Sequence, residues 1–135
     1  MKALFIVGSL LAAVAALLAV AHLTLIEVGR EVVTLRTSRP DGSWQSTRLW
    51  VIDDNGATWL HSGGVDWLQR FERSPIVELE RTGKTQHYSA EAIPGPHPRI
   101  DKLLREKYGI ADRWVRFVAP CNEDAVPVRL EPFSG

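Results

Sequence analysis

The side chains that could carry out chemistry unaided are few and scattered in this sequence. The single cysteine, Cys121, follows Pro120 in a predicted loop and has no histidine near it, so we interpret it as a packing or surface thiol. It also has no partner for an internal disulfide. His61, His87 and His97 show no ligand spacing with one another or with a paired carboxylate. The sequence therefore predicts neither a nucleophile nor a metal site.

Other residues are suited to holding a flat ligand that carries an anionic group. The run Ser62-Gly63-Gly64 leads from a predicted strand into a predicted helix, so free amides and the helix N-terminus would point at one spot suited to phosphate. An ordinary strand-to-helix turn is the alternative. Trp50 and Trp59 lie on neighbouring predicted strands, where they either stack on a ring or pack against the sheet.

Two further aromatic residues, Tyr108 and Trp114, flank Gly109 between two predicted helices. The Tyr108 hydroxyl is a candidate hydrogen-bond donor to a substrate. The alternative is that these residues only fasten the end of a helix to the sheet. The spacing alone leaves both interpretations open.

After residue 30, short β-branched or apolar runs alternate with turn signals. Asn55-Gly56 is a strong hairpin signal because both positions tolerate positive φ, and Thr82-Gly83 joins a second pair of runs. Pro127, inside the last run, implies an edge strand or a bulge. The predicted strands are 31–38, 47–53, 57–62, 76–81, 84–92 and 125–130, and the predicted helices are 65–73, 98–108 and 111–118. This pattern predicts a mainly β (α+β) barrel of about six antiparallel strands with two or three helices.

Residues 3–21 form an uncharged apolar run, long enough as a helix to cross a hydrocarbon core of roughly 30 Å. We therefore assign residues 1–29 to a transmembrane anchor and 30–135 to the folded domain. A cleaved signal peptide is the alternative, because Ala19-Val20-Ala21 is an acceptable cleavage site, but the length of the run favours the anchor. The basic residues on its two sides favour a single-pass membrane protein with a cytoplasmic domain: Lys2 before it, and Arg30, Arg36 and Arg39 after it.

Composition limits the classes of partner. The 135 residues have room for one domain, and a net charge of zero gives no basic surface for nucleic acid. Exposed strand edges, together with the bulky Trp67 and Trp114, suggest a homodimer.

Five stretches after Arg30, in their order and spacing, resemble the deazaflavin (F-420)-dependent nitroreductase and quinone reductase family. They are VVTLRT at 32–37, TRLWVIDDNGATWLHSGG at 47–64, VELERTGK at 77–84, REKYGIADRW at 105–114 and PVRLEP at 127–132. The resemblance implies a split β-barrel that holds its cofactor in a groove between the barrel and adjoining helices. It also implies an oxidoreductase that passes hydride from a reduced deazaflavin, or from FMN as the second choice, to a quinone or nitro compound.

In such a protein the cofactor carries the reactive carbon, so the side chains mainly bind and orient it. The candidate cofactor-binding residues are Arg48, Trp50, Ser62, Gly63, Gly64 and Trp67, and the candidate catalytic residues beside the acceptor are Tyr108 and Trp114. Members of the family carry a basic turn between the first two strands for the anionic tail of the cofactor. Here Gln45 or Ser46 stands near that position, and we predict Arg48 as the substitute. The alternative functions are a non-enzymatic flavin-binding module and a protein-interaction module.

Overall fold

The computed structural model describes residues 1–63, 66–118 and 125–134, and the contacts among them divide the chain into two units, residues 1–30 and 31–135. The first unit is one long helix, α1 (Lys2–Glu27), with a short turn after it. Its 26 residues rise about 39 Å, more than the roughly 30 Å of a hydrocarbon core. One helix is therefore long and apolar enough to cross a membrane.

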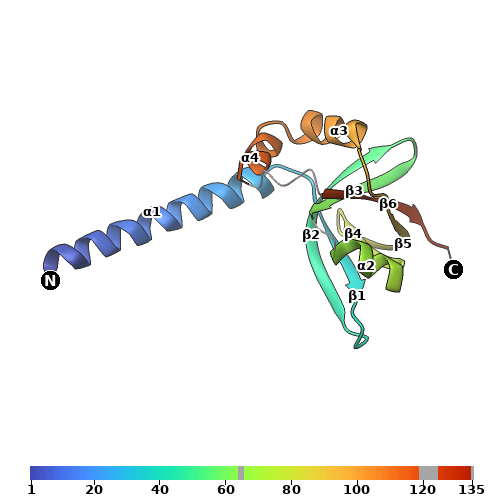
Figure 1. Ribbon diagram of the computed structural model, residues 1–135, viewed down its shortest axis with the longest axis horizontal. Helices are drawn as coiled ribbons and strands as arrows, with labels where there is room; N and C mark the ends of the chain where they lie inside the picture. Colours follow the sequence, from blue (N-terminus) through green and yellow to red (C-terminus); the bar gives the residue numbers. More distant parts are fainter. Residues whose placement is uncertain (64–65, 119–124, 135) are drawn as a thin grey trace. The chain divides into compact units, whose positions relative to one another are not determined.

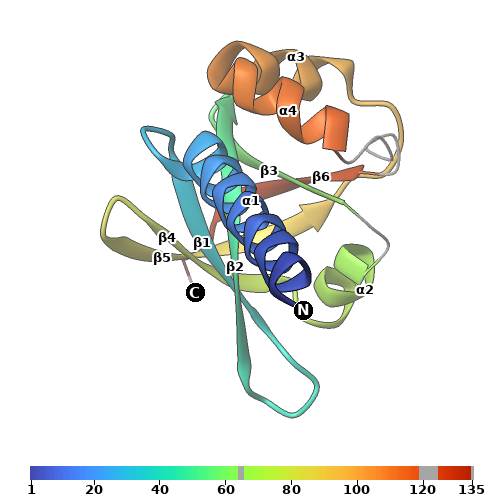
Figure 2. The ribbon, with the colours of Figure 1, turned by 90° about the vertical axis from the view of Figure 1, so that its left-hand side faces the viewer.

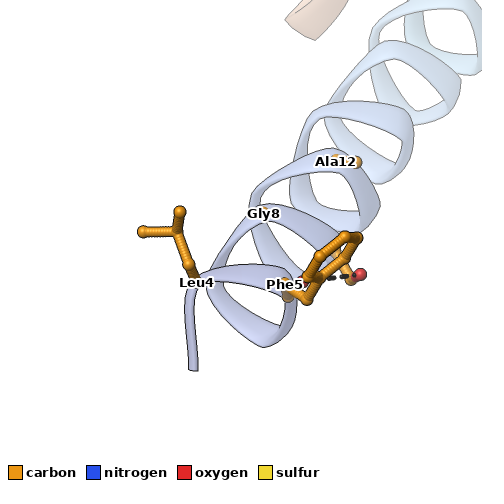
Figure 3. Close-up of a pocket in the computed structure, with 5 residues that line it drawn as sticks. Leu4, Phe5, Gly8 and Ala12 are labelled. Atoms are coloured by element: carbon orange, nitrogen blue, oxygen red, sulfur yellow. Dashed lines mark hydrogen bonds between the residues drawn. The ribbon is translucent and has the colours of Figure 1, made fainter. Parts of the chain in front are cut away.

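The surface of α1 carries a shallow apolar hollow beside Phe5. Figure 3 shows that Leu4, Phe5, Gly8 and Ala12, which border this hollow, all belong to the same helix. Such a hollow is the outer surface of a helix, open along its side, and it provides no enclosed binding site. Its apolar lining suits contact with lipid chains.

The second unit is a closed barrel of six antiparallel strands (Figure 1). The order around the barrel is β1-β2-β3-β6-β5-β4, and β4 pairs with β1 to close it. The predicted fold class is therefore confirmed. The strands are β1 (Val32–Ser38), β2 (Trp44–Asp54), β3 (Ala57–Gly63), β4 (Ile76–Arg81), β5 (Lys84–Ala92) and β6 (Ala125–Pro132).

Alternation along each strand fills the barrel with aliphatic side chains. The core residues from the strands are nearly completely buried: Val33, Leu35, Val51, Leu60, Val77, Leu79, Ala90, Val128 and Leu130. Phe71, which lies outside the strands, completes this core. Because side chains alternate, the even-numbered residues of β2, among them Arg48 and Trp50, lie on the outer face, opposite Leu49 and Val51. The prediction that Arg48 and Trp50 share one face of this strand agrees with the register.

Two tight turns fix the register of neighbouring hairpins. Asn55 and Gly56 have φ of 51° and 76°, and Thr82 and Gly83 have the same pair of values. Positive φ at both central residues matches the twist of the flanking strands, as the Asn-Gly signal predicts. The hairpin of β1 and β2 is longer than predicted, because β2 begins at Trp44, which pairs with Ser38. In the turn between these strands, Asp41 accepts hydrogen bonds from the backbone N–H and the hydroxyl of Ser43.

Although the six strands close into a barrel, β2 and β3 pair over only part of their length, and this opening is called the split. Their pairing runs only from Asp54–Ala57 to Val51–Leu60, although β2 reaches back to Trp44 and β3 continues to Gly63. α2 (Asp66–Arg73) follows β3, and its Phe71 is buried in the barrel core. This helix therefore closes the end of the barrel at which the two strands separate.

α3 (Pro98–Tyr108) and α4 (Ile110–Val118) pack against each other outside the barrel, with α3 over β2 (Figure 2). α3 buries Ile100, Leu104 and Tyr108, which are spaced by one helical turn, and it ends at Gly109, whose φ is 52°. The bounds of α3 are those predicted from Pro98 and Gly109, because proline suits the first turn of a helix and glycine suits its end.

The prediction that Pro127 marks an edge strand or a bulge is wrong. β6 lies between β3 and β5, and Pro127 is fully buried. The β3–β6 register passes Pro127 without an extra residue, whereas the β5–β6 register ends at Val128. The Pro127 carbonyl accepts a hydrogen bond from the N–H of Ile93, which lies just past the end of β5. An N–H at position 127 would point towards β5, as the Pro127 carbonyl does, but at a point where the ladder with β5 has already ended. Proline, which has no N–H, therefore removes no hydrogen bond from the sheet.

Candidate functional site

A basic hollow lies between the β1–β2 turn and α2. It has a volume of about 250 Å³ and is lined by Ser38, Arg39, Pro40, Gln45, Gln69, Arg70 and Arg73. Arg70 and Arg73 belong to the last turn of α2, where cations interact favourably with the helix dipole. Two elements that are distant in sequence thus bring three guanidinium groups to one place, where they can bind phosphate or carboxylate oxygens.

The polar groups of this hollow are partly held in position by local contacts. The Nε of Arg73 donates to the carbonyl oxygen of Gln69 at 3.3 Å. On the turn, hydrogen bonds from Ser43 lower the pKa of Asp41, and the charge of Arg39 contributes to the same shift. Asp41 is therefore an ionised neighbour that offsets part of the positive charge, and the hollow keeps an excess of cations.

Sequence reasoning missed this hollow because its two sides meet only in the fold. The family resemblance places a basic position near Gln45 or Ser46, and Gln45 does line the hollow. The cations, however, come from Arg39 before the turn and from Arg70 and Arg73 of α2. The spacing of Arg70 and Arg73, one turn apart near the end of a predicted helix, was the available signal.

Arg48, the predicted ligand of the cofactor tail, is an exposed residue of the outer face of β2, paired across the ladder with Thr34. It does not line the basic hollow. It does lie on the part of β2 that has separated from β3, so it borders the split of the barrel. Its role as a tail ligand stays a prediction.

Trp50 and Tyr108 are brought together by the packing of α3 on β2. Their ring centroids lie 4.3 Å apart with an interplanar angle of 8°, a stacked pair. Trp50 therefore uses one ring face for packing, which was the alternative to stacking on a cofactor.

Tyr108 is buried, and the backbone holds its hydroxyl. The hydroxyl donates to the carbonyl oxygen of Glu31 at 2.7 Å and accepts from the N–H of Val51 at 3.0 Å. Burial raises the pKa of Tyr108 to about 12, so the phenol is neutral at physiological pH. These contacts support the alternative in which Tyr108 fastens α3 to the barrel, and its role as a donor to the acceptor stays a prediction.

Ion pairs surround this junction. Arg81 of β4 bridges the carboxylates of Glu31 and Asp53, with its closest atoms at 2.9 Å and 2.7 Å. Lys107 of α3 pairs with Glu31 and donates to the carbonyl oxygen of Val51 at 2.7 Å. The hydrogen bond from Arg81 is the main cause that lowers the pKa of both Glu31 and Asp53. This network stabilises the junction of β1, β2 and α3.

The remaining predicted site residues are described only in part. Trp114 is half-buried on α4, with its ring centroid 6.1 Å from that of Phe117. Ser62 and Gly63 pair with Val126 and Ala125 as the last residues of β3. Gly64, Cys121 and the side chains of Ser62 and Trp67 lie outside the described residues.

Although the histidines show no ligand spacing in the sequence, the fold brings two of them together. The Nε2 atoms of His61 on β3 and His97 at the start of α3 are 3.0 Å apart, and Asp101 lies beside both. The spacing of His97 and Asp101, one turn apart at the start of a helix, was readable in the sequence. The approach of His61 was not, because it depends on the packing of α3 against the barrel.

Known proteins resemble this chain in structure but not detectably in sequence. In sequence, no protein-family model and no curated protein matches this chain. Among solved structures, a conserved hypothetical protein from Mycobacterium tuberculosis is 21% identical, with a TM-score of 0.59 over 78% of this chain and 75% of the other. An F-420 reductase is 17% identical, with a TM-score of 0.54 over 83% of this chain and 93% of the reductase. A FAD-binding protein from Mesorhizobium loti is 15% identical, with a TM-score of 0.53 over 82% and 86% of the two chains. This chain therefore has a split β-barrel fold that an F-420 reductase and a FAD-binding protein also have.

Proposed function

We propose that this protein is a membrane-tethered oxidoreductase that binds a deazaflavin, or FMN as the second choice. When bound, the reduced cofactor supplies a hydride to a quinone or nitro-type acceptor, and the acceptor takes up the accompanying proton. The fold supports this proposal, because an F-420 reductase and a FAD-binding protein have it too. The observation that carries it is the basic hollow between the β1–β2 turn and α2.

The hollow has the chemistry that the anionic tail of such a cofactor requires. Three guanidinium groups and two amide side chains surround it, and a guanidinium can hold two oxygens of a phosphate or carboxylate at once. It therefore supplies the positive charge that is missing near Gln45 and Ser46, at the same β1–β2 turn. Helix α2 lines part of the hollow and comes directly after β3, which forms one side of the opening between β2 and β3. A cofactor with its tail in the hollow could therefore place its ring at this opening.

We assign the ring of the cofactor to the split between β2 and β3. Arg48 lies along one side of this opening, and the Ser62-Gly63 end of β3 lies along the other. The resemblance to the nitroreductase family points to the same region, since its members hold the ring between the barrel and adjoining helices. In this arrangement the protein binds and orients the ring and contributes no nucleophile.

Membrane tethering by α1 fits the proposed acceptors. The helix is long and apolar enough to span a bilayer, and quinones dissolve in the hydrocarbon region. We propose a single-pass protein with a cytoplasmic domain, as the flanking basic residues favour. A homodimer also stays a proposal, although the closed order of the six described strands removes free strand edges as a reason for it.

Cofactor titration tests the proposal. Full-length protein in detergent is titrated with oxidised deazaflavin and, separately, with FMN, and the cofactor fluorescence is followed. The wild type should bind at least one of them. Replacing Arg70 and Arg73 together by Gln should weaken binding by more than tenfold, about 1.4 kcal/mol, with a smaller salt dependence.

The matched control is Arg105→Gln, which removes an exposed guanidinium from the last turn of α3, away from the hollow. It should bind cofactor as the wild type does. Arg48→Met separates the two candidate tail ligands, because it should reduce affinity only if the tail reaches β2. If neither cofactor binds to the wild type, or if the Arg105 control loses as much affinity as the double variant, the proposal fails.

A binding module without catalysis is the second candidate. It is favoured by Tyr108, the candidate donor, whose hydroxyl is already engaged by Glu31 and Val51. Mixing the protein with reduced cofactor and a soluble quinone distinguishes the two functions. Cofactor binding without faster quinone reduction would identify the module.

A further inference from the structure

A second cluster of polar side chains lies between the outer face of β3 and the start of α3. His61, His97 and Asp101 meet there, and none of them lines the basic hollow. The Asp101 Oδ1 atom is 3.7 Å from the Nε2 of His61 and 3.6 Å from the Nε2 of His97. Their side chains are only 12%, 24% and 10% exposed in the order His61, Asp101, His97. The ligand atoms of three groups that can bind a metal thus lie together in one partly enclosed place.

The orientation of His97 is suited to a ligand. Its Nδ1 lies 2.8 Å from the carbonyl oxygen of Gly95, which can only accept, so Nδ1 carries the hydrogen. In the neutral ring Nε2 then presents a lone pair to the cluster. Histidines that bind metals are commonly held in this way, with the other ring nitrogen donating to a backbone carbonyl.

His61 reaches the same place from the barrel side. Its side chain is only 12% exposed, and its Nε2 lies beside that of His97 and the carboxylate of Asp101. One neutral histidine can donate its Nε2 hydrogen to the other at 3.0 Å, and this hydrogen bond is the alternative to a metal. In the tautomer with the hydrogen on Nδ1, His61 offers a second lone pair instead.

The distances fit one ion. The nearest point equidistant from the three atoms lies in their plane, about 2.0 Å from each. An ion displaced slightly from this plane towards a fourth ligand keeps distances in the usual range of zinc–nitrogen and zinc–oxygen bonds. We propose that His61, His97 and Asp101 bind one divalent transition-metal ion of the Zn²⁺ type. Two imidazoles and one carboxylate suit Zn²⁺ or another ion of similar ligand preference, whereas Mg²⁺ and Ca²⁺ prefer oxygen ligands.

Arg116 of α4 decides how the carboxylate is held. It donates to Asp101 Oδ1 at 3.1 Å and to Asp112 Oδ2 at 2.8 Å. Because Asp112 is buried and keeps Arg116 anchored, the arginine can orient Asp101 while the ion takes up the negative charge. Three protein ligands leave a fourth position of a tetrahedral ion for water or a small anion.

Metal titration of the full-length protein tests this proposal. Protein stripped with a chelator and held in detergent is titrated with Zn²⁺ against a chromophoric chelator, and with Co²⁺ while its visible absorption is followed. We expect one ion per chain and the absorption bands of a four-coordinate Co²⁺ site. Asp101→Asn and His97→Gln, which keep the side-chain size, should each weaken Zn²⁺ binding by more than tenfold.

His87→Gln is the matched control. His87 Nε2 lies 3.4 Å from Glu78 on the barrel surface, so it is a histidine–carboxylate pair with 55% exposure and outside the cluster. This variant should bind Zn²⁺ as the wild type does. Thermal melting without metal shows that each variant folds, and added Zn²⁺ should raise the melting temperature of the wild type but not of Asp101→Asn.

Binding that survives both cluster substitutions, or that is lost in the His87 control, would overturn the proposal. Absence of saturable binding in the wild type would leave the His61–His97 contact as a hydrogen bond only. These measurements use no flavin, deazaflavin or acceptor, so their outcome is independent of the proposed oxidoreductase function.

Discussion

Substitution of Tyr108 by Phe removes one oxygen atom from the junction of α3 with the barrel. β1 pairs with β2 only as far as Val32–Trp50, so the next residue of β2, Val51, has no partner residue in β1. The Tyr108 hydroxyl takes that place, accepting from the Val51 N–H at 3.0 Å and donating to the Glu31 carbonyl at 2.7 Å. It caps the end of the β1–β2 ladder.

The expected cost follows from what remains after the substitution. The phenylalanine ring can keep the stack on Trp50, and the Val51 carbonyl keeps its hydrogen bond from Lys107. The Val51 N–H is left buried without an acceptor, since Val51 has no exposed surface. One buried unsatisfied donor costs about 1–3 kcal/mol, so we expect a loss of about 2 kcal/mol in the free energy of unfolding. For a domain of this size that is a fall of about 8 °C in melting temperature.

Chemical and thermal unfolding, followed by circular dichroism, measure this loss. Tyr88→Phe is the matched control, because the Tyr88 hydroxyl has only a 3.4 Å contact with Gln86 near the surface. It should change the free energy of unfolding by less than about 0.5 kcal/mol. Unchanged stability in Tyr108→Phe, or an equal loss in both variants, would refute the capping role. Lost quinone reduction at unchanged stability would instead support Tyr108 as the donor to the acceptor.

Three other outcomes are expected. Folding raises the pKa of Tyr108 to about 12, so the stability that the neutral phenol adds is complete below about pH 10 and is lost towards pH 12. Alkaline unfolding of the wild type and of Tyr108→Phe measures this pH dependence. Because Arg81 lowers the pKa of Glu31 and Asp53, the stability that they add is lost below about pH 4, and Arg81→Gln should flatten this acid dependence. Gly83→Val, at a φ of 76°, should cost about 1–2 kcal/mol in urea unfolding through backbone strain alone.

Much of the barrel could be predicted because local signals set its hairpins. β4 and β5 have the predicted bounds, since Pro75 precedes the first strand and Thr82-Gly83 turns the chain between them. α3 is bounded by Pro98 and Gly109 in the same way. These residues act through their own backbone preferences and need no knowledge of distant contacts.

The placement of β6 and the candidate sites required the fold. The prediction for Pro127 is wrong because the loss of its amide matters only on the side where a partner strand continues, and the β5 ladder ends one residue short of it. The basic hollow and the cluster of His61, His97 and Asp101 each join a strand or turn to a helix that lies distant in sequence. Residue types and local spacing carry no information on which helix covers which strand.

The position of β6 between β3 and β5 has a consequence for how the protein is made. Synthesis proceeds from the N-terminus, so β3 and β5 leave the ribosome well before residues 125–132 can pair with them. Until then the nascent chain exposes two unpaired strand edges, and the contacts that close the barrel span much of its length. Folding should therefore be slow relative to hairpin formation, and the exposed edges are where a chaperone would protect the unfinished chain from aggregation.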